Sequence, residues 1–155
     1  MGSKIRLGIL GGGGDSLIGV LHRVAANMFD QYEIVGGVFN PDLEENVSFA
    51  KKIGLPTHRV YKDFETLIKE EVRLPENERM QVISILTPNF LHYPMAKKLL
   101  ENGFHVICEK PLTTTYNEAL DLKKTQELSN SVFAVTYTYT GYPMVRQMRK
   151  MVEEG

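Results

Sequence analysis

The residues best suited to chemistry are two adjacent charged side chains, Glu109 and Lys110, in the run CEKP. They follow His105–Cys108, an apolar run that predicts a buried strand. Charged side chains at the end of a buried strand cost free energy unless they point into a polar cleft or pair with each other. A lysine in such a cleft can bind a substrate hydroxyl or transfer its proton. We therefore take Lys110 as the candidate catalytic residue.

A second candidate site is the glycine run Gly11–Gly14, followed by Gly19. It lies between an apolar run and a helical pattern. Glycine lets the backbone approach a diphosphate, and the start of a helix offers free N–H groups. The strict G-x-G-x-x-G spacing is absent, because its sixth position is Ser16. Gly19 would be the third glycine of a turn enlarged by about three residues; a plain mobile loop is the alternative that this context disfavours.

Asn40 stands about 20 residues past the glycines, where a ribose-binding residue is expected after the second strand. Its side chain carries no charge to repel a 2′-phosphate, and no arginine stands beside it to bind one. The sequence therefore favours NAD over NADP as cofactor, with NADP still possible. Asn40-Pro41-Asp42 also fits a turn with a helix cap, and both interpretations can hold together.

Six strand-like runs alternate with helix-like segments and would position these residues. Such alternation predicts an α/β fold of three layers, a doubly wound parallel sheet of the Rossmann type with about six strands. Its ligand crevice lies beyond the carboxyl ends of the strands. We predict a single dinucleotide-binding domain over residues 1–155. The expected strands are Lys4–Leu10, Tyr32–Phe39, His58–Tyr61, Met80–Leu86, His105–Cys108 and Val132–Tyr139.

Helix boundaries are marked by capping residues. Asp42 and Asp63 are placed as N-caps, and Thr115 begins a capping box with the glutamate three residues later. Pro94 is expected at the first position of one helix, and Pro143 opens the last. That last helix carries an apolar stripe of Val145, Met148 and Val152.

Composition limits the class of protein. The 155 residues have 43% hydrophobic content and a formal net charge of -1, with charges interspersed, so a nucleic-acid partner is not expected. The N-terminal apolar run is too short for a signal peptide or a membrane span, which predicts a cytoplasmic protein. The single cysteine, Cys108, excludes an internal disulfide and fits a core position. The four histidines lack ligand spacing, so no metal is expected and His22 is interpreted as structural.

Several motifs together resemble the N-terminal domain of the Gfo/Idh/MocA oxidoreductases, which include glucose–fructose oxidoreductase and inositol dehydrogenase. The resemblance covers essentially the whole chain. Its most specific element is the Glu-Lys-Pro run, whereas the glycine turn alone is not specific. The motifs are the glycine turn, Gly19-x-x-His22, Thr87-Pro88-Asn89-x-x-His92 and Cys108-Glu109-Lys110-Pro111.

The resemblance implies hydride transfer between NAD(P) and a carbinol carbon of a sugar, cyclitol or related polyol. It implies that Lys110 binds or protonates the substrate, that Glu109 contacts the cofactor and that the Lys110–Pro111 bond is cis. The segment Tyr137–Tyr142 would pass near the nicotinamide. The full set of expected cofactor-binding residues is Gly11, Gly13, Gly14, Ser16, Ile18, Gly19, Asn40, Thr87, Pro88, Asn89, His92, Glu109, Lys110 and Tyr137.

Members of that family run to well over twice this length, and their second α/β domain binds the substrate and supplies a catalytic histidine and aspartate. We therefore expect this chain to be the cofactor domain of a larger, homo-oligomeric enzyme, with little or no turnover by itself. The apolar stripe of the last helix, which no later element covers, agrees with that expectation.

Two other classes of protein share some of these features. A dinucleotide-binding regulator would keep the fold without catalysis, but it has no evident need for the Glu109–Lys110 pair. An S-adenosylmethionine methyltransferase also has glycines after its first strand. That class usually has an acidic residue at the end of the second strand, where this chain has Asn40, and it has no use for Glu-Lys-Pro.

Overall fold

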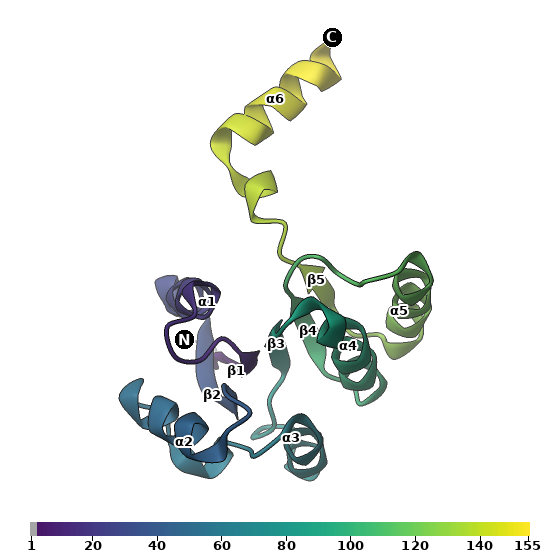
Figure 1. The fold of residues 1–155 in the computed structure, drawn as a ribbon. Coiled ribbons are helices and arrows are strands. Elements are labelled where there is room, and N and C mark those ends of the chain that lie inside the picture. Colours follow the sequence, from purple (N-terminus) through teal and green to yellow (C-terminus); the bar gives the residue numbers. More distant parts are fainter. Residues whose placement is uncertain (1–2) are drawn as a thin grey trace.

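A computed structural model describes residues 3–155 and contains one sheet of five parallel strands in the order β2-β1-β3-β4-β5 (Figure 1). The step from β1 to β2 and the steps from β3 to β5 run in opposite directions across the sheet. Right-handed crossovers therefore place helices on both faces, which confirms the doubly wound α/β fold. The strands are β1 Ile5–Gly11, β2 Tyr32–Val38, β3 Val82–Leu86, β4 His105–Cys108 and β5 Phe133–Val135.

The helices form two layers around this sheet. Helices α1 and α2 cover one face, and α3, α4 and α5 cover the other, while α6 projects away from both layers (Figure 1). Three short 3-10 helices complete the connections. The helices are α1 Leu17–Met28, α2 Leu43–Lys52, η1 Thr57–Arg59, α3 Phe64–Glu71, η2 Asn89–Leu91, α4 His92–Glu101, α5 Tyr116–Ser129, η3 Thr138–Gly141 and α6 Pro143–Glu154.

The hydrophobic core is divided by the sheet into two clusters. Ile9 in β1 packs with Phe49 of α2 on one face, and Ile83 in β3 packs with Leu99 of α4 on the other. All five residues of β3 are buried, as expected for a central parallel strand. Burying each aliphatic side chain of this size contributes about 1.5–3 kcal/mol, so β1 and β3 form the rigid centre of the fold.

The predicted caps are confirmed. The Asp42 carboxylate accepts the Glu45 N–H at 2.9 Å, and that of Asp63 accepts the Thr66 N–H at 2.7 Å. Thr115 forms the expected capping box at the start of α5. Helix α4 begins at His92, so Pro94 is the third residue of that helix rather than the first.

The prediction of six strands is wrong by one. Residues 58–61 form part of η1 and a single isolated bridge between Gly37 and Val60, not a strand. The Val60 N–H closes a turn on the Thr57 carbonyl at 3.2 Å, and the Tyr61 N–H donates to the Gly37 carbonyl at 3.0 Å, so the segment meets β2 at one point without forming a ladder.

The last predicted strand, Val132–Tyr139, is shorter than expected. It pairs with β4 only over Phe133–Val135 and then turns into η3. The Thr136 N–H donates to the Cys108 carbonyl at 3.0 Å, and the Tyr137 N–H donates back to the Val135 carbonyl at 2.9 Å. These local bonds take the chain out of the sheet immediately above the end of β4.

Helix α6 opens at Pro143 as predicted and extends away from the sheet (Figure 1). Its apolar residues Met144, Met148, Met151 and Val152 are between 59% and 82% exposed. Among residues 3–155, no helix is long and apolar enough to cross a membrane.

Candidate functional site

The glycine turn joins β1 to α1 at the carboxyl edge of the sheet. Ser16 caps α1, since its hydroxyl oxygen accepts the Gly19 N–H at 3.2 Å. A Cβ atom on Gly19 would lie 1.9 Å from the Gly12 carbonyl oxygen, so only glycine lets the helix pack on the turn. Gly11 has a φ of 81°, a conformation that favours glycine. Gly19 thus has the close-packing role expected of the third glycine in a phosphate-binding turn.

A cavity of about 550 Å³ opens beside this turn, between the ends of β1, β2 and β3. Six residues of the glycine, Asn40 and Thr-Pro-Asn motifs line it, together with apolar side chains. The exposed backbone of the glycine turn and an apolar wall fit a nucleotide, whose phosphates need N–H donors and whose base needs an apolar slot. The motif residues lining it are Gly11, Gly12, Gly13, Asn40, Thr87 and Pro88.

Asn40 borders this cavity and also builds the turn before α2. Its amide nitrogen donates to the Glu45 carboxylate at 2.6 Å, and its oxygen accepts the Asp42 N–H at 2.8 Å. Both interpretations of Asn40-Pro41-Asp42 are therefore compatible with the geometry. The arrangement also holds the negative charge of Glu45, which lines the neighbouring hollow beside α2, against Asn40 of the cavity, which the sequence did not indicate.

Glu109 lies directly after β4 and is only 6% exposed. One carboxylate oxygen accepts the Thr136 hydroxyl at 2.6 Å and lies 3.0 Å from His22 Nε2. The other accepts the Lys110 N–H at 3.2 Å. Burial raises the pKa of Glu109, but the hydrogen bonds from Thr136, His22 and the Lys110 backbone outweigh it, so the pKa lies below its usual value. Glu109 is therefore a carboxylate at neutral pH.

His22 is the partner of Glu109 that sequence reasoning missed. Its Nδ1 lies 3.0 Å from the Ser84 hydroxyl of β3, so the ring joins α1 to β3 and to the end of β4. It was expected to be a structural histidine, with no partner identified. The available signal was its place one helical turn after Gly19, on the face of α1 that packs against the sheet.

His92 is buried between two backbone carbonyls. Its Nδ1 lies 2.8 Å from the Pro111 oxygen and its Nε2 lies 2.9 Å from the Thr87 oxygen. Both ring nitrogens thus face backbone carbonyls, so His92 lies between the loop after β3 and the loop after β4 and donates to one or the other according to its tautomer. Its expected contact with cofactor stays a prediction. The Lys110–Pro111 bond is cis, as the resemblance implied.

The remaining expected cofactor residues lie outside the glycine cavity. Gly14 borders a shallow hollow beside α2. Ile18 lines a separate apolar groove of about 550 Å³ between α1 and the sheet, together with His22 and Thr136. Asn89 is exposed at the start of η2, and Tyr137 is 57% exposed after β5. Their contacts with a cofactor remain predictions.

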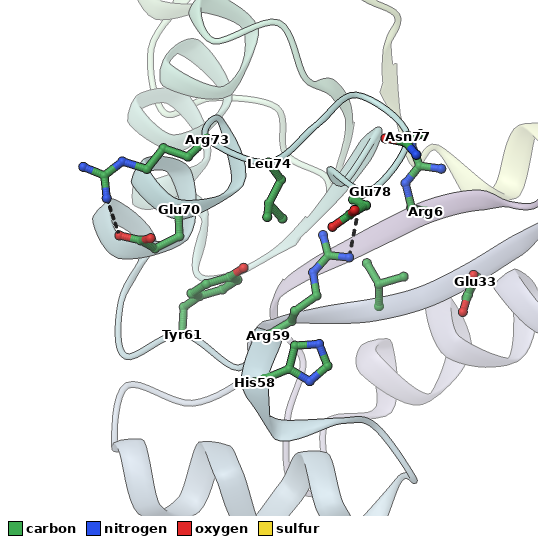
Figure 2. A pocket seen from close by; sticks show the side chains of 11 residues that line it. Arg6, Glu33, His58, Arg59, Tyr61, Glu70, Arg73, Leu74, Asn77 and Glu78 are labelled. Atoms are coloured by element: carbon green, nitrogen blue, oxygen red, sulfur yellow. Dashed lines mark hydrogen bonds and ion pairs between the residues drawn. The ribbon is translucent and has the colours of Figure 1, made fainter.

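A further cavity lies at the opposite, amino-terminal edge of the sheet, and the arginines that line it are bonded within the same region (Figure 2). Arg59 binds Glu71 and the Glu78 carbonyl, and Arg73 binds Glu70. Arg6 donates to the carbonyls of Glu76 and Arg79. These bonds fix the loop between α3 and β3, so this cavity is part of the scaffold.

No three metal-ligating side chains converge within residues 3–155. Cys108 is fully buried, and burial together with the nearby Glu109 charge raises the pKa of its thiol to about 12. The thiol is therefore protonated at neutral pH and packs as an apolar core residue.

The fold and the glycine cavity define a dinucleotide-binding domain of the Rossmann type, with its ligand crevice at the carboxyl ends of the strands. The chain belongs to the Gfo/Idh/MocA oxidoreductase family with an NAD-binding Rossmann fold, whose family model matches residues 5–137.

The chain is similar to an uncharacterized oxidoreductase, YfiI, of Bacillus subtilis, with 36% identity over 97% of this chain and 38% of that protein. It resembles a crystal structure of an oxidoreductase from Sinorhizobium meliloti, with 43% identity, a TM-score of 0.89 and coverage of 99% and 42% of the two chains. It also resembles an inositol dehydrogenase homolog of Azotobacter vinelandii complexed with NADH and myo-inositol, with 38% identity, a TM-score of 0.91 and coverage of 99% and 40%. The chain thus spans about two fifths of these relatives.

Proposed function

We propose that this chain is the NAD-binding part of a dehydrogenase that oxidises a hydroxyl group of a sugar, cyclitol or related polyol. The observation that carries the proposal is the position of Lys110, exposed beside a buried carboxylate at the end of β4, on the same carboxyl edge of the sheet as the glycine cavity. The NADH and myo-inositol complex of the Azotobacter vinelandii relative supports both the cofactor and the substrate class.

In this proposal the glycine cavity takes the adenosine half of the cofactor. The backbone of Gly11–Gly14 and the start of α1 face the diphosphate, because a helix N-terminus offers free N–H groups and a positive dipole end. Asn40 binds the adenosine ribose. Glu45, held 2.6 Å from Asn40, disfavours a 2′-phosphate by charge repulsion, so NAD is preferred to NADP.

Lys110 acts on the substrate at the other half of the crevice. The nicotinamide, when bound, accepts the hydride from the carbinol carbon. The Lys110 side-chain nitrogen binds the reacting oxygen, and its unprotonated amine accepts the hydroxyl proton, becoming an ammonium, as the hydride leaves the carbinol carbon. Because the side chain is exposed, it is available to a substrate that approaches from outside this domain.

The residues that choose the substrate are proposed to lie in the part of the relatives that this chain does not cover. The chain matches about two fifths of those proteins, so a substrate domain, a homo-oligomeric assembly and a cytoplasmic location belong to the proposal. The 155 residues alone are then expected to bind dinucleotide and to turn over little substrate.

Calorimetric titration of the chain with NADH, NADPH and S-adenosylmethionine tests the proposal. Binding of NADH, weaker binding of NADPH and no binding of S-adenosylmethionine are expected. Failure to bind either dinucleotide would overturn the proposal. In the longer enzyme, Lys110→Ala should remove turnover and leave NADH affinity nearly unchanged, whereas unchanged turnover would remove Lys110 from the mechanism.

A further inference from the structure

Two histidines from opposite faces of the sheet, His22 partly buried and His92 fully buried, meet on one short segment, Glu109–Pro111. His22 belongs to α1, which packs in the cluster of Ile9 and Phe49, and His92 belongs to α4, which packs in the cluster of Ile83 and Leu99. The segment between them carries Lys110. One helix from each face of the sheet, α1 and α4, therefore contacts the loop that presents the proposed catalytic lysine.

The contact from α1 acts through a side chain. His22 Nε2 lies 3.0 Å from one Glu109 oxygen, and the second Glu109 oxygen accepts the Lys110 N–H at 3.2 Å. The ring is held in turn by the Ser84 hydroxyl at 3.0 Å, and the carboxylate is also held by the Thr136 hydroxyl at 2.6 Å. The Glu109 carboxylate thus connects His22 of α1 to the backbone N–H of Lys110.

The contact from α4 acts on the backbone directly. His92 Nδ1 lies 2.8 Å from the carbonyl oxygen of Pro111, the residue after the lysine. The opposite ring nitrogen lies 2.9 Å from the Thr87 carbonyl in the neighbouring loop. The Lys110 N–H, through the Glu109 carboxylate, and the Pro111 carbonyl are therefore each linked to a histidine that has a second partner of its own.

The Lys110 side chain has no comparable anchor. Within residues 3–155, no hydrogen bond or ion pair holds its ammonium group, and the side chain is exposed. The direction in which the side chain leaves the sheet is therefore set by its backbone alone. A free ammonium on a fixed backbone is suited to a group that must meet a substrate at one position.

We propose that His22 and His92 act as a pair of positioning residues for Lys110, His22 through the Glu109 carboxylate and His92 through the Pro111 carbonyl. The inference rests on the proposed function, because it assigns the pair to the nicotinamide half of the cofactor site. In that half, the backbone of Glu109–Pro111 forms a wall of the site, while the lysine ammonium faces the substrate.

The first measurement separates the two halves of the cofactor. Affinities for NADH and for ADP-ribose, which lacks the nicotinamide, are compared by calorimetry for the 155-residue chain and its variants. His22→Leu should weaken NADH by about tenfold, since a charge-assisted hydrogen bond is lost, and leave ADP-ribose within about twofold. His22→Gln, whose amide can still donate to Glu109, should recover most of the NADH affinity.

His58→Leu is the matched control, because His58 is exposed at the amino-terminal edge of the sheet and should alter neither affinity. Equal weakening of NADH and ADP-ribose by His22→Leu would mean that the histidine only supports α1, and would overturn the proposal. The proposal would also be overturned if His22→Leu bound NADH and ADP-ribose with the affinities of the wild-type chain.

The second measurement needs no ligand and tests His92 as well. In the ¹⁵N spectrum of the free chain, the Lys110 amide proton reports its hydrogen bond to Glu109. The resonance of the Lys110 amide proton should move upfield in His22→Leu and in His92→Gln, and should be unchanged in His58→Leu. An unmoved Lys110 amide in the first two variants would overturn the inference even if they fold poorly at higher temperature. If the wild-type chain binds neither NADH nor ADP-ribose, the proposed function fails, while the Lys110 amide still decides whether the histidines hold the segment.

Discussion

Two buried glutamates at opposite edges of the same sheet show how one residue type serves two purposes. Glu71, at the amino-terminal edge, is fully buried and binds the guanidinium of Arg59, the Tyr61 hydroxyl and the Met80 N–H. Glu109, at the carboxyl edge, is bound by His22 and Thr136. A permanent cation neutralises the first carboxylate, whereas the second keeps a charge beside the crevice.

The difference extends to the surrounding cavities. At the amino-terminal edge the arginines that line the cavity bind carboxylates or backbone carbonyls of the same region (Figure 2). At the carboxyl edge the Lys110 ammonium is exposed. Charges at the first edge stabilise a loop, and charges at the second are available to a ligand. Variants at the two edges should therefore separate stability from binding.

The largest expected effect is a loss of stability at the amino-terminal edge. Glu71→Gln leaves the Arg59 guanidinium buried without its counter-charge, which should lower the free energy of unfolding by about 3–5 kcal/mol. Urea denaturation measures it. Glu70→Gln, at an exposed ion pair with Arg73, is the control and should cost less than about 1 kcal/mol. Similar losses in the two variants would remove the special role of Glu71.

The glycine turn should show the converse, a loss of binding. In Gly19→Ala, the new Cβ atom conflicts with the Gly12 carbonyl oxygen, so α1 or the turn must shift at a cost of about 1–3 kcal/mol. NADH affinity, measured by calorimetry, should fall by at least about tenfold. Gly141→Ala has open space around its Cβ and serves as the control. Retained NADH affinity in Gly19→Ala would contradict the phosphate-binding role of the turn.

Glu109→Gln should combine the two effects, a loss of stability as in Glu71→Gln and a loss of binding as in Gly19→Ala. Losing the carboxylate should lower the free energy of unfolding by about 1.5–3 kcal/mol, since hydrogen bonds to a charged group are lost. Unlike Glu71→Gln, it should also reduce the ratio of NADH to ADP-ribose affinity. If the two glutamine variants change that ratio equally, the functional distinction between the two edges fails.

The same carboxylate predicts a dependence of stability on pH. The pKa of Glu109 is lowered from 4.5 in the folded chain, so the stability it contributes is present above pH 4.5 and is lost as pH falls through the lowered pKa. The difference in unfolding free energy between the wild-type chain and Glu109→Gln should therefore shrink below about pH 4.5. A difference that grows on acidification would mean that the folded-state pKa is raised.

The smallest expected effect concerns the choice of cofactor. The chain should bind NADH about tenfold more tightly than NADPH, and Glu45→Gln should reduce that ratio severalfold by removing the charge held against Asn40. Glu33→Gln, at the amino-terminal cavity, is the control. A ratio that is unchanged by Glu45→Gln would assign the selectivity to Asn40 alone.

Local signals explain what the sequence could predict. The apolar runs of β1 and β4, the caps at Asp42 and Asp63 and the close-packed Gly19 all depend on neighbouring residues. The structure agrees with these predictions because a few neighbouring residues determine whether a strand is buried and where a helix is capped.

The features that were missed depend on distant pairs. His22 and Glu109 are 87 residues apart, and neither residue identifies the other in the sequence. The expected strand at 58–61 failed because Thr57–Arg59 form a 3-10 turn and the segment pairs with β2 at a single bridge, between Gly37 and Val60. Whether a short apolar run becomes a strand depends on its pairing with a distant strand, which the run itself does not show.

The buried ring of His92 faces two carbonyl oxygens, but a neutral imidazole carries only one N–H. With the hydrogen on Nδ1 the ring binds Pro111, and with the hydrogen on Nε2 it binds Thr87. The carbonyls of Thr87 and Pro111 therefore share a single N–H donor, and the tautomer of His92 decides which of the two loops it binds. A ligand that supplies Thr87 with another donor would release that proton to Pro111 and tighten the loop that carries the lysine.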